Sequence, residues 1–193
     1  DLLGLLKDGL EYNNFIHKYR VEVFNKNIQN IPINKLCSEG YRFIKFIINP
    51  YIRAVSIFRA QTSHNLSFRE YLKQLVRNKI DYFNDNDKYH LHKQYITGEE
   101  DIINEYICID KYETHTIKLH NGEDYVIDVN KYTSIHHGKK TSDTSFCGDV
   151  PKNEINQKLP SSYKYFYDDE IKSLVEKYYK DDIENYGFSF NDF

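Results

Sequence analysis

The apolar positions of this chain alternate between helical spacing and the denser runs that are typical of strands. At the start, leucines recur at helical spacing and predict an amphipathic helix that ends near residues 13–14: Leu2, Leu3, Leu6 and Leu10. A short strand is predicted at Val21–Phe24. Residues 25–40 are rich in turn formers and include Pro32 and Gly40.

The middle of the chain contains a compact apolar run, Phe43–Ile48, which is interrupted only by Lys45. Such a run predicts a strand buried on both faces, as in a parallel sheet. Asn49-Pro50 follows directly. Because Asn is a favoured N-cap and Pro suits the first helical position, we expect a helix to begin at Pro50. Its apolar positions continue at Ala54, Val55 and Phe58.

A second helix start is marked by Ser67 and Glu70, which form the S-x-x-E pattern of a capping box. Residues 83–101 are polar and predict a loop. Tyr106–Asp110 predicts another short strand.

A hairpin is predicted where Asn121-Gly122 separates Thr116–Leu119 from Tyr125–Val129, because Asn-Gly favours a tight turn between strands. Residues 130–163 show weak periodicity and mixed polarity, so we expect a long surface excursion.

The clearest helix lies near the end, from about Asp168 to Tyr186, with Gly187 as the residue just after it. Its helical spacing comes from Ile171, Leu174, Val175, Tyr178, Ile183 and Tyr186. Strands separated by helices predict an α/β fold with helices on the faces of a sheet. We expect residues 1–193 to form a single domain.

Composition narrows the classes of function. The chain has 193 residues, of which 40% are apolar, enough for one packed core. Its 29 acidic and 26 basic groups give a net charge of −3, which disfavours nonspecific nucleic-acid binding. No stretch approaches the roughly 20 apolar residues of a membrane span, so we expect none in this chain.

The first candidate for chemistry is the predicted passage from strand to helix at Asn49. Free N–H groups and the positive end of the helix dipole meet there, which favours an anion such as phosphate or sulfate. Arg53 and Ser56 lie three residues apart and share a helix face. The alternative is a simple Asn-Pro helix start, with Arg53 as a surface or ion-paired residue.

This segment resembles the 3′-phosphate-binding motif of sulfotransferase family 2, the carbohydrate and Golgi-type branch. The family pattern is approximately R-N-P-Y-x-R-x-V-S-x-Y/F, and the chain matches it at Asn49, Pro50, Tyr51, Arg53, Val55, Ser56 and Phe58. Family members bind 3′-phosphoadenosine 5′-phosphosulfate (PAPS) and hold its 3′-phosphate with the first Arg and the Ser. The resemblance therefore implies that Asn49, Arg53 and Ser56 bind the donor. The position of the first Arg is occupied by Ile48.

A second segment, Asp87–Gln94, resembles the family's D-x-H-x-x-P-Q region. His90 and Gln94 fall on the matching positions, and Lys93 replaces Pro. If the protein is an enzyme, this resemblance makes His90 the candidate general base for the acceptor hydroxyl. The alternative is a solvated loop histidine.

Two further segments follow in the family order. Ile109–Thr114 resembles the strand-terminal K-Y-E segment and supplies Glu113, the second candidate base, which could instead pair with a nearby cation. Val175–Phe188 resembles the closing segment of the family. The family's P-K-x-G-x-T/S loop, which binds the 5′-phosphosulfate, has no match between Asp1 and Gly40. That strand and loop either precede Asp1 or have been lost.

Together these segments imply a P-loop-like parallel sheet and a PAPS-dependent transfer of a sulfuryl group to a hydroxyl of a carbohydrate or related acceptor. The second hypothesis is a catalytically inactive sulfotransferase-like module that binds a partner or has a structural role. A third is an α/β domain for another nucleotide. No metal is expected, because the adjacent His136 and His137 are poorly placed to chelate one ion, and a basic loop is the simpler interpretation.

The three cysteines, Cys37, Cys108 and Cys147, form no C-x-x-C pair and are odd in number, which favours a reducing, cytoplasmic compartment. The chain begins at Asp1 and contains no Met, so we expect an upstream segment. The Golgi lumen stays open if that segment carried an anchor.

Overall fold

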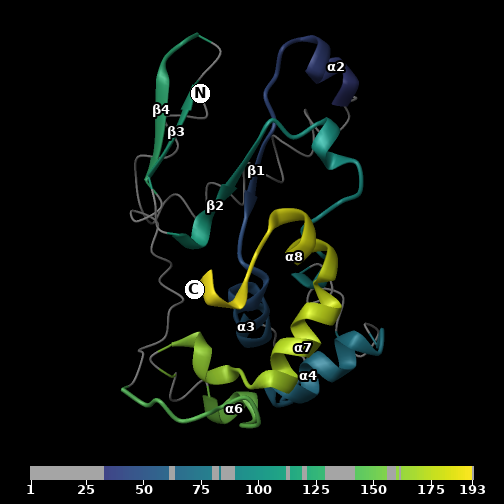
Figure 1. The fold of residues 1–193 in the computed structure, drawn as a ribbon, viewed down its shortest axis with the longest axis vertical. Coiled ribbons are helices and arrows are strands. Elements are labelled where there is room, and N and C mark those ends of the chain that lie inside the picture. Colours follow the sequence, from purple (N-terminus) through teal and green to yellow (C-terminus); the bar gives the residue numbers. More distant parts are fainter. Residues whose placement is uncertain are drawn as a thin grey trace.

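A computed structural model of the chain describes residues 33–60, 64–79, 83, 90–111, 114–118, 121–128, 142–155, 160 and 162–192. Its helices are α2 (Ile33–Ser38), α3 (Pro50–Ala60), α4 (Phe68–Val76), α6 (Lys152–Ile155), α7 (Asp169–Tyr178) and α8 (Lys180–Tyr186). Its strands are β1 (Ile44–Ile47), β2 (Glu105–Cys108), β3 (Thr114–Lys118) and β4 (Asp124–Asp128). Short 3-10 helices are η4 (Glu99–Asp101), η5 (Ile109–Lys111), η7 (Tyr163–Phe166) and η8 (Phe190–Asp192). The fold is mixed α/β, with small parallel and antiparallel sheets flanked by helices (Figure 1).

The parallel pair β1–β2 confirms the strands predicted within Phe43–Ile48 and Tyr106–Asp110, although β2 ends at Cys108 and η5 follows it. Its register joins Ile44 to Glu105 and Ile47 to Cys108. The prediction that β1 is buried on both faces is wrong for the described structure, because half of the Phe46 surface is exposed. Successive strand residues point to opposite faces. The described elements bury Ile47 on one face and leave Phe46 on the other open to solvent.

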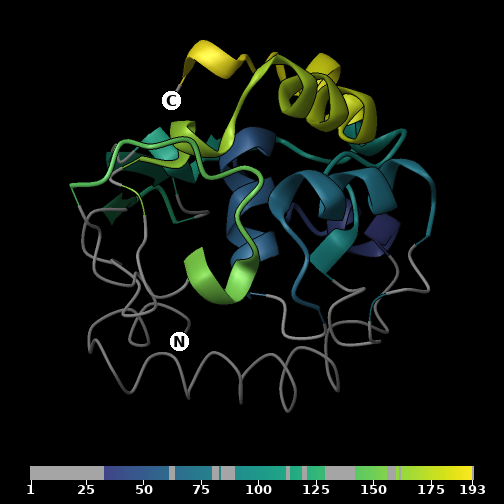
Figure 2. The same cartoon turned by 90° about the horizontal axis from the view of Figure 1, so that it is seen from below.

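Three helices, α3, α4 and α7, enclose the core below the parallel strands (Figures 1 and 2). The predicted start of α3 at Pro50 is confirmed. Large rings fill much of the core, and they pack mainly edge to face, which is favourable for aromatic pairs. The largest fully buried side chains include Phe58, Phe68, Tyr71, Phe166 and Tyr179.

The start of α4 confirms the predicted capping box. Ser67 Oγ accepts from the Glu70 N–H at 3.3 Å, and Glu70 Oε2 accepts from the Ser67 N–H at 3.0 Å. These two bonds satisfy N–H groups that the helix itself leaves free.

The β3–β4 hairpin is also confirmed, with Thr114 paired to Asp128 and Lys118 to Asp124. Gly122 adopts a φ of 84° in the turn, a conformation that glycine reaches without a steric penalty. In the predicted turn-rich region, the described part contains α2, followed by Gly40 at a φ of 80°.

The prediction of one continuous C-terminal helix from about Asp168 to Tyr186 is wrong. The helix breaks at Tyr179 into α7 and α8, while Gly187 ends α8 in the left-handed conformation at a φ of 67°. Tyr179 packs its buried ring beneath the Arg53 guanidinium, and Asp182 is buried three residues later. These contacts with distant segments override the regular helical period.

The predicted surface excursion at 130–163 is partly wrong. Its described portion contains α6, and Ile155 is 2% exposed within the core. Gly148 also lies against Phe166 and Ile171, so this segment closes one side of the helical layer. The predicted elements at Leu2–Leu10 and Val21–Phe24 lie outside the described residues.

Candidate functional site

Asn49 occupies the junction between β1 and α3, as predicted, and its polar groups are already used there. Asn49 Oδ1 accepts from the Tyr51 N–H at 3.0 Å, which makes Asn49 the N-cap. Its Nδ2 donates to the Ser189 carbonyl at 3.0 Å. The side chain is 2% exposed, so its role in this structure is to cap α3 and to anchor the C-terminal segment.

A carboxylate lies at the same helix start, and sequence reasoning did not find it. Asp110 Oδ2 accepts from the Asn49 N–H at 2.6 Å. Asp110 also accepts from the Cys108 thiol. The start of α3 therefore faces an internal anion, which is where a helix dipole stabilises one.

Gln94 holds the residue before Asn49 through both of its backbone groups. Its Oε1 accepts from the Ile48 N–H at 2.9 Å, and its Nε2 donates to the Ile48 carbonyl at 2.8 Å. This is the pairing that a neighbouring strand would provide. Gln94 therefore continues the hydrogen bonding of β1 after the strand has ended.

Arg53 is held by an internal network instead of projecting into solvent. Its Nη1 lies 3.9 Å from Asp182 Oδ2, and the two side chains are 16% and 0% exposed. Its Nη2 donates to the carbonyls of His90, at 3.2 Å, and His92, at 2.5 Å. The ion-paired alternative for Arg53 is the one that this structure contains.

Ser56 is half-buried on the second turn of α3, one helical turn after Arg53. His90 is exposed, and its backbone carbonyl accepts a hydrogen bond from Arg53. The structure therefore brings His90 and Arg53 together. Glu113 lies outside the described residues, as do His136 and His137.

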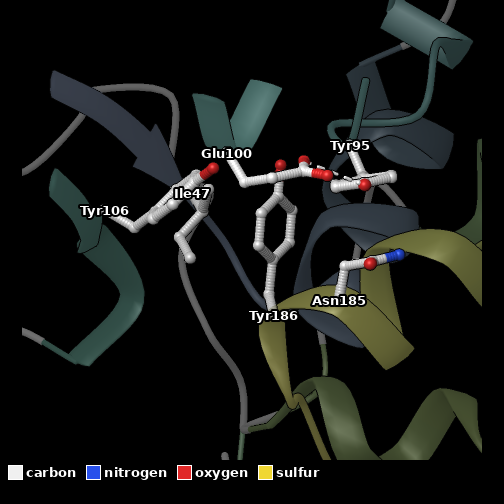
Figure 3. A pocket seen from close by; sticks show the side chains of 6 residues that line it. All are labelled: Ile47, Tyr95, Glu100, Tyr106, Asn185 and Tyr186. Carbon is white, nitrogen blue, oxygen red and sulfur yellow. Dashed lines mark hydrogen bonds between the residues drawn. The ribbon is translucent and has the colours of Figure 1, made fainter. Parts of the chain in front are cut away.

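A second site, which the sequence did not single out, is a pocket of about 270 Å³ between β1, β2 and α8 (Figure 3). We call it the tyrosine pocket, and it is lined by Ile47, Tyr95, Glu100, Tyr106, Asn185 and Tyr186. In Figure 3 the Tyr186 ring stands between Tyr106 on one side and Tyr95 on the other. The ring centres lie 5.4 Å apart for Tyr106 and Tyr186, and 5.9 Å apart for Tyr95 and Tyr186.

The polar groups around this pocket are dominated by carboxylates. Glu100 Oε2 accepts from the Tyr95 hydroxyl at 3.1 Å, and Glu99 Oε1 accepts from the Tyr186 hydroxyl at 2.5 Å. Lys45 forms an ion pair with Glu99. Although burial opposes it, hydrogen bonds from Lys45 and Tyr186 lower the pKa of Glu99, so Glu99 stays charged.

The tyrosine hydroxyls of the pocket are held in their neutral form. Burial raises the pKa of Tyr186, and the hydrogen bond to Glu99 raises it further. The pKa of Tyr106 is also raised, by burial and then by the negative charge of Glu99. Both effects disfavour phenolate, so the hydroxyls act as hydrogen-bonding groups.

The tyrosine pocket could not be predicted from the sequence, because its lining residues span positions 47 to 186 and follow no regular spacing. Because the chain contains 18 tyrosines, the three that line this pocket do not stand out in the sequence. A weak signal existed in Glu99-Glu100-Asp101, an acidic run flanked by tyrosines.

Within the described segments, no cluster of three or more His, Cys, Asp or Glu side chains is arranged to hold a metal ion. None of the helices in that part of the chain has the length and apolar character to cross a membrane. Cys37 is exposed, and Cys108 and Cys147 are half-buried.

Comparison of the chain with protein families, with curated proteins and with solved structures finds no match.

Proposed function

We propose that this chain transfers a sulfuryl group from PAPS to a hydroxyl of a carbohydrate or related acceptor, on a P-loop-like parallel sheet. The observation that carries the proposal is the passage from β1 through Asn49 into α3, beside the parallel strand β2. Ser56 lies half-buried on the second turn of that helix. The resemblance of Ile48–Phe58 to the family's 3′-phosphate motif requires this order of strand, cap, helix and serine.

The three candidate donor-binding residues differ in what they can offer to PAPS. The Asn49 amide is used within the chain, and the Arg53 guanidinium is paired with Asp182 and two carbonyls. Ser56 is therefore the residue we assign to the 3′-phosphate. The chain lacks the family's first Arg at Ile48, so we expect weak donor binding.

The second candidate function is an inactive sulfotransferase-like module, and one observation favours it. The Asp110 carboxylate already occupies the start of α3, 2.6 Å from the Asn49 nitrogen. A second anion at this helix start would be repelled by Asp110 and would share its helix dipole. In this alternative, the internal carboxylate has replaced the ligand phosphate.

Calorimetry with adenosine 3′,5′-bisphosphate separates the two functions. Ser56→Ala should weaken binding, whereas the matched control Ser173→Ala, an exposed serine on α7, should not. Ile48→Arg should tighten binding roughly 10- to 150-fold, the worth of a charge-assisted hydrogen bond. Asp110→Asn should tighten it too, because repulsion is removed. If the parent, Ile48→Arg and Asp110→Asn all fail to bind, the inactive module is the correct function.

Catalysis is tested by comparing two histidines with the same backbone role. The proposed step breaks the bond from sulfur to the bisphosphate leaving group and forms one to the acceptor oxygen, whose proton passes to the base. His90→Ala should lower turnover about 100- to 10,000-fold, the usual worth of a general base. His92→Ala is the matched control, since both residues are exposed and give their carbonyls to Arg53.

The assay measures transfer of labelled sulfate from PAPS to a panel of glycan acceptors. Equal activity in the two histidine variants would remove His90 from the mechanism and make Glu113 the next residue to replace. Absence of transfer together with absence of bisphosphate binding would refute the enzyme hypothesis.

A further inference from the structure

The tyrosine pocket has the shape of a shallow aromatic cage. The Tyr186 ring meets Tyr106 at an interplanar angle of 53° and Tyr95 at 76°, so the rings form walls and do not stack. Tyr106 is 37% exposed at the rim. Ile47 supplies an apolar wall, and Asn185 lies at the rim on the side of Tyr95 (Figure 3). Concave sites with aromatic walls and a few polar groups are typical of small-ligand pockets.

The charge of the lining is negative. Glu100 is exposed and is the charged member of the lining set. Lys45 does not compensate it, because the Lys45 ammonium is bound by Glu99 and by the Gln94 carbonyl. The negative charges of Glu99 and Glu100 also contribute to the raised pKa of Tyr106, after burial. The same negative charges that disfavour a phenolate in this pocket favour a positively charged ligand.

The protein itself places a cation on one of these rings. The Lys45 ammonium lies over the Tyr186 ring, 5.7 Å from its centre. An ammonium within about 6 Å of a ring centre is attracted by the electron-rich face. Lys45 does not line the pocket, so the Tyr95 and Tyr106 rings stay available to a ligand.

We propose that the tyrosine pocket binds the alkylammonium group of a small ligand, with the cation against the tyrosine faces and beside the Glu100 carboxylate. Rings at steep angles provide several electron-rich surfaces, and quaternary and protonated amines are the groups that aromatic cages recognise. The same charges disfavour a polyanion, so this site is separate from any donor phosphate near Ser56. The proposal holds whether or not the chain binds PAPS.

The test is a titration of the labelled chain followed by NMR, because the 18 tyrosines make intrinsic fluorescence unspecific. Choline is compared with 3,3-dimethyl-1-butanol, which has the same shape and no charge. Glucosamine, with its protonated amine, is compared with glucose. We expect choline to bind roughly 5- to 30-fold more tightly than its neutral analogue, the worth of a cation–π contact. Tighter binding of choline than of glucosamine would indicate a quaternary ammonium ligand, and the reverse would indicate an amino sugar.

Substitutions of pocket residues test whether the ligands bind in the tyrosine pocket. Tyr106→Leu should abolish the preference for the charged ligand, and the Tyr95 and Asn185 signals should shift in the parent. Glu100→Gln keeps an acceptor for Tyr95 and should weaken choline binding about 2- to 5-fold, as for an exposed ion pair. Glu184→Gln removes an equal charge beside Asn185 and outside the lining, so it should change nothing.

Three results would overturn the proposal. One is equal affinity for each charged ligand and its neutral partner, which would mean that the cage recognises shape or sugar rings. Another is an equal loss of choline affinity in Glu100→Gln and Glu184→Gln, which would mean that binding depends only on the net charge of the protein. The third is absence of shifts at Tyr95, Tyr106 and Asn185 through the millimolar range of choline and glucosamine.

Discussion

Replacing Asp182 by alanine should destabilise this protein more than any nearby change of charge. The Asp182 side chain is fully buried at the start of α8. It accepts from the backbone N–H of Gln94 at 2.9 Å and from that of Tyr95 at 2.7 Å. It also lies 3.9 Å from Arg53 Nη1. One carboxylate thus joins α3, the segment around residue 94 and α8.

The expected loss of unfolding free energy follows from the groups that lose their partner when Asp182 is replaced. Each hydrogen bond to a charged group is worth about 1.5–3 kcal/mol, and two backbone donors would lose their acceptor. The Arg53 guanidinium would keep its carbonyl partners and lose its counter-charge. Removing one partner of a buried ion pair typically costs about 3–5 kcal/mol. We therefore expect Asp182→Ala to lower the free energy of unfolding by ~3–5 kcal/mol.

Asp181→Ala is the matched control, one residue away in the same first turn of α8. Asp181 is about half exposed and pairs with Lys93 at 2.8 Å. Because surface pairs contribute little, this control should cost no more than about 1 kcal/mol. Both substitutions remove an acidic group near the helix start, so the difference between them isolates the buried contacts.

The assay is urea unfolding followed by circular dichroism, with free energies from linear extrapolation. The midpoint should fall strongly for Asp182→Ala at an unchanged m-value. A double-mutant cycle with Arg53→Met should give a coupling of about 0.5–3 kcal/mol. Equal losses for Asp181→Ala and Asp182→Ala, or zero coupling to Arg53, would refute the structural role of the buried carboxylate.

Three further predictions concern single features of the fold. Ser67→Ala removes the N-cap of α4 and should cost about 1 kcal/mol in thermal or urea unfolding; no loss would contradict the capping box. Gly148→Ala would place a Cβ 2.6 Å from the Phe166 carbonyl oxygen, so overpacking should cost about 1–3 kcal/mol by urea unfolding, and an unchanged midpoint would contradict this close contact. The hydrogen bond from Arg69 lowers the pKa of Asp168, so this ion pair stabilises the fold above the unfolded pKa of Asp and is lost as pH falls. Urea midpoints should therefore decline below about pH 4 in the parent, and less steeply in Arg69→Met; parallel pH profiles would contradict the pair.

The features that the sequence determined are those whose cause lies within a few residues. The capping box at Ser67 satisfies helix donors with a residue three positions away. Asn49-Pro50 starts α3, and Asn121-Gly122 turns the β3–β4 hairpin, because each pair of residues has a strong local conformational preference. These signals need no knowledge of the rest of the chain.

The tertiary structure decided how distant segments use the same residues. Asn49 is paired with Asp110, 61 positions away, and this contact turns a predicted anion site into a site with an internal anion. Arg53 faces Asp182, and the break at Tyr179 that brings Asp182 into place is invisible in the helical period. The tyrosine pocket likewise joins β1, β2 and α8. Such contacts depend on how the chain packs around its core, and pairs separated by so many residues leave no periodic signal in one sequence.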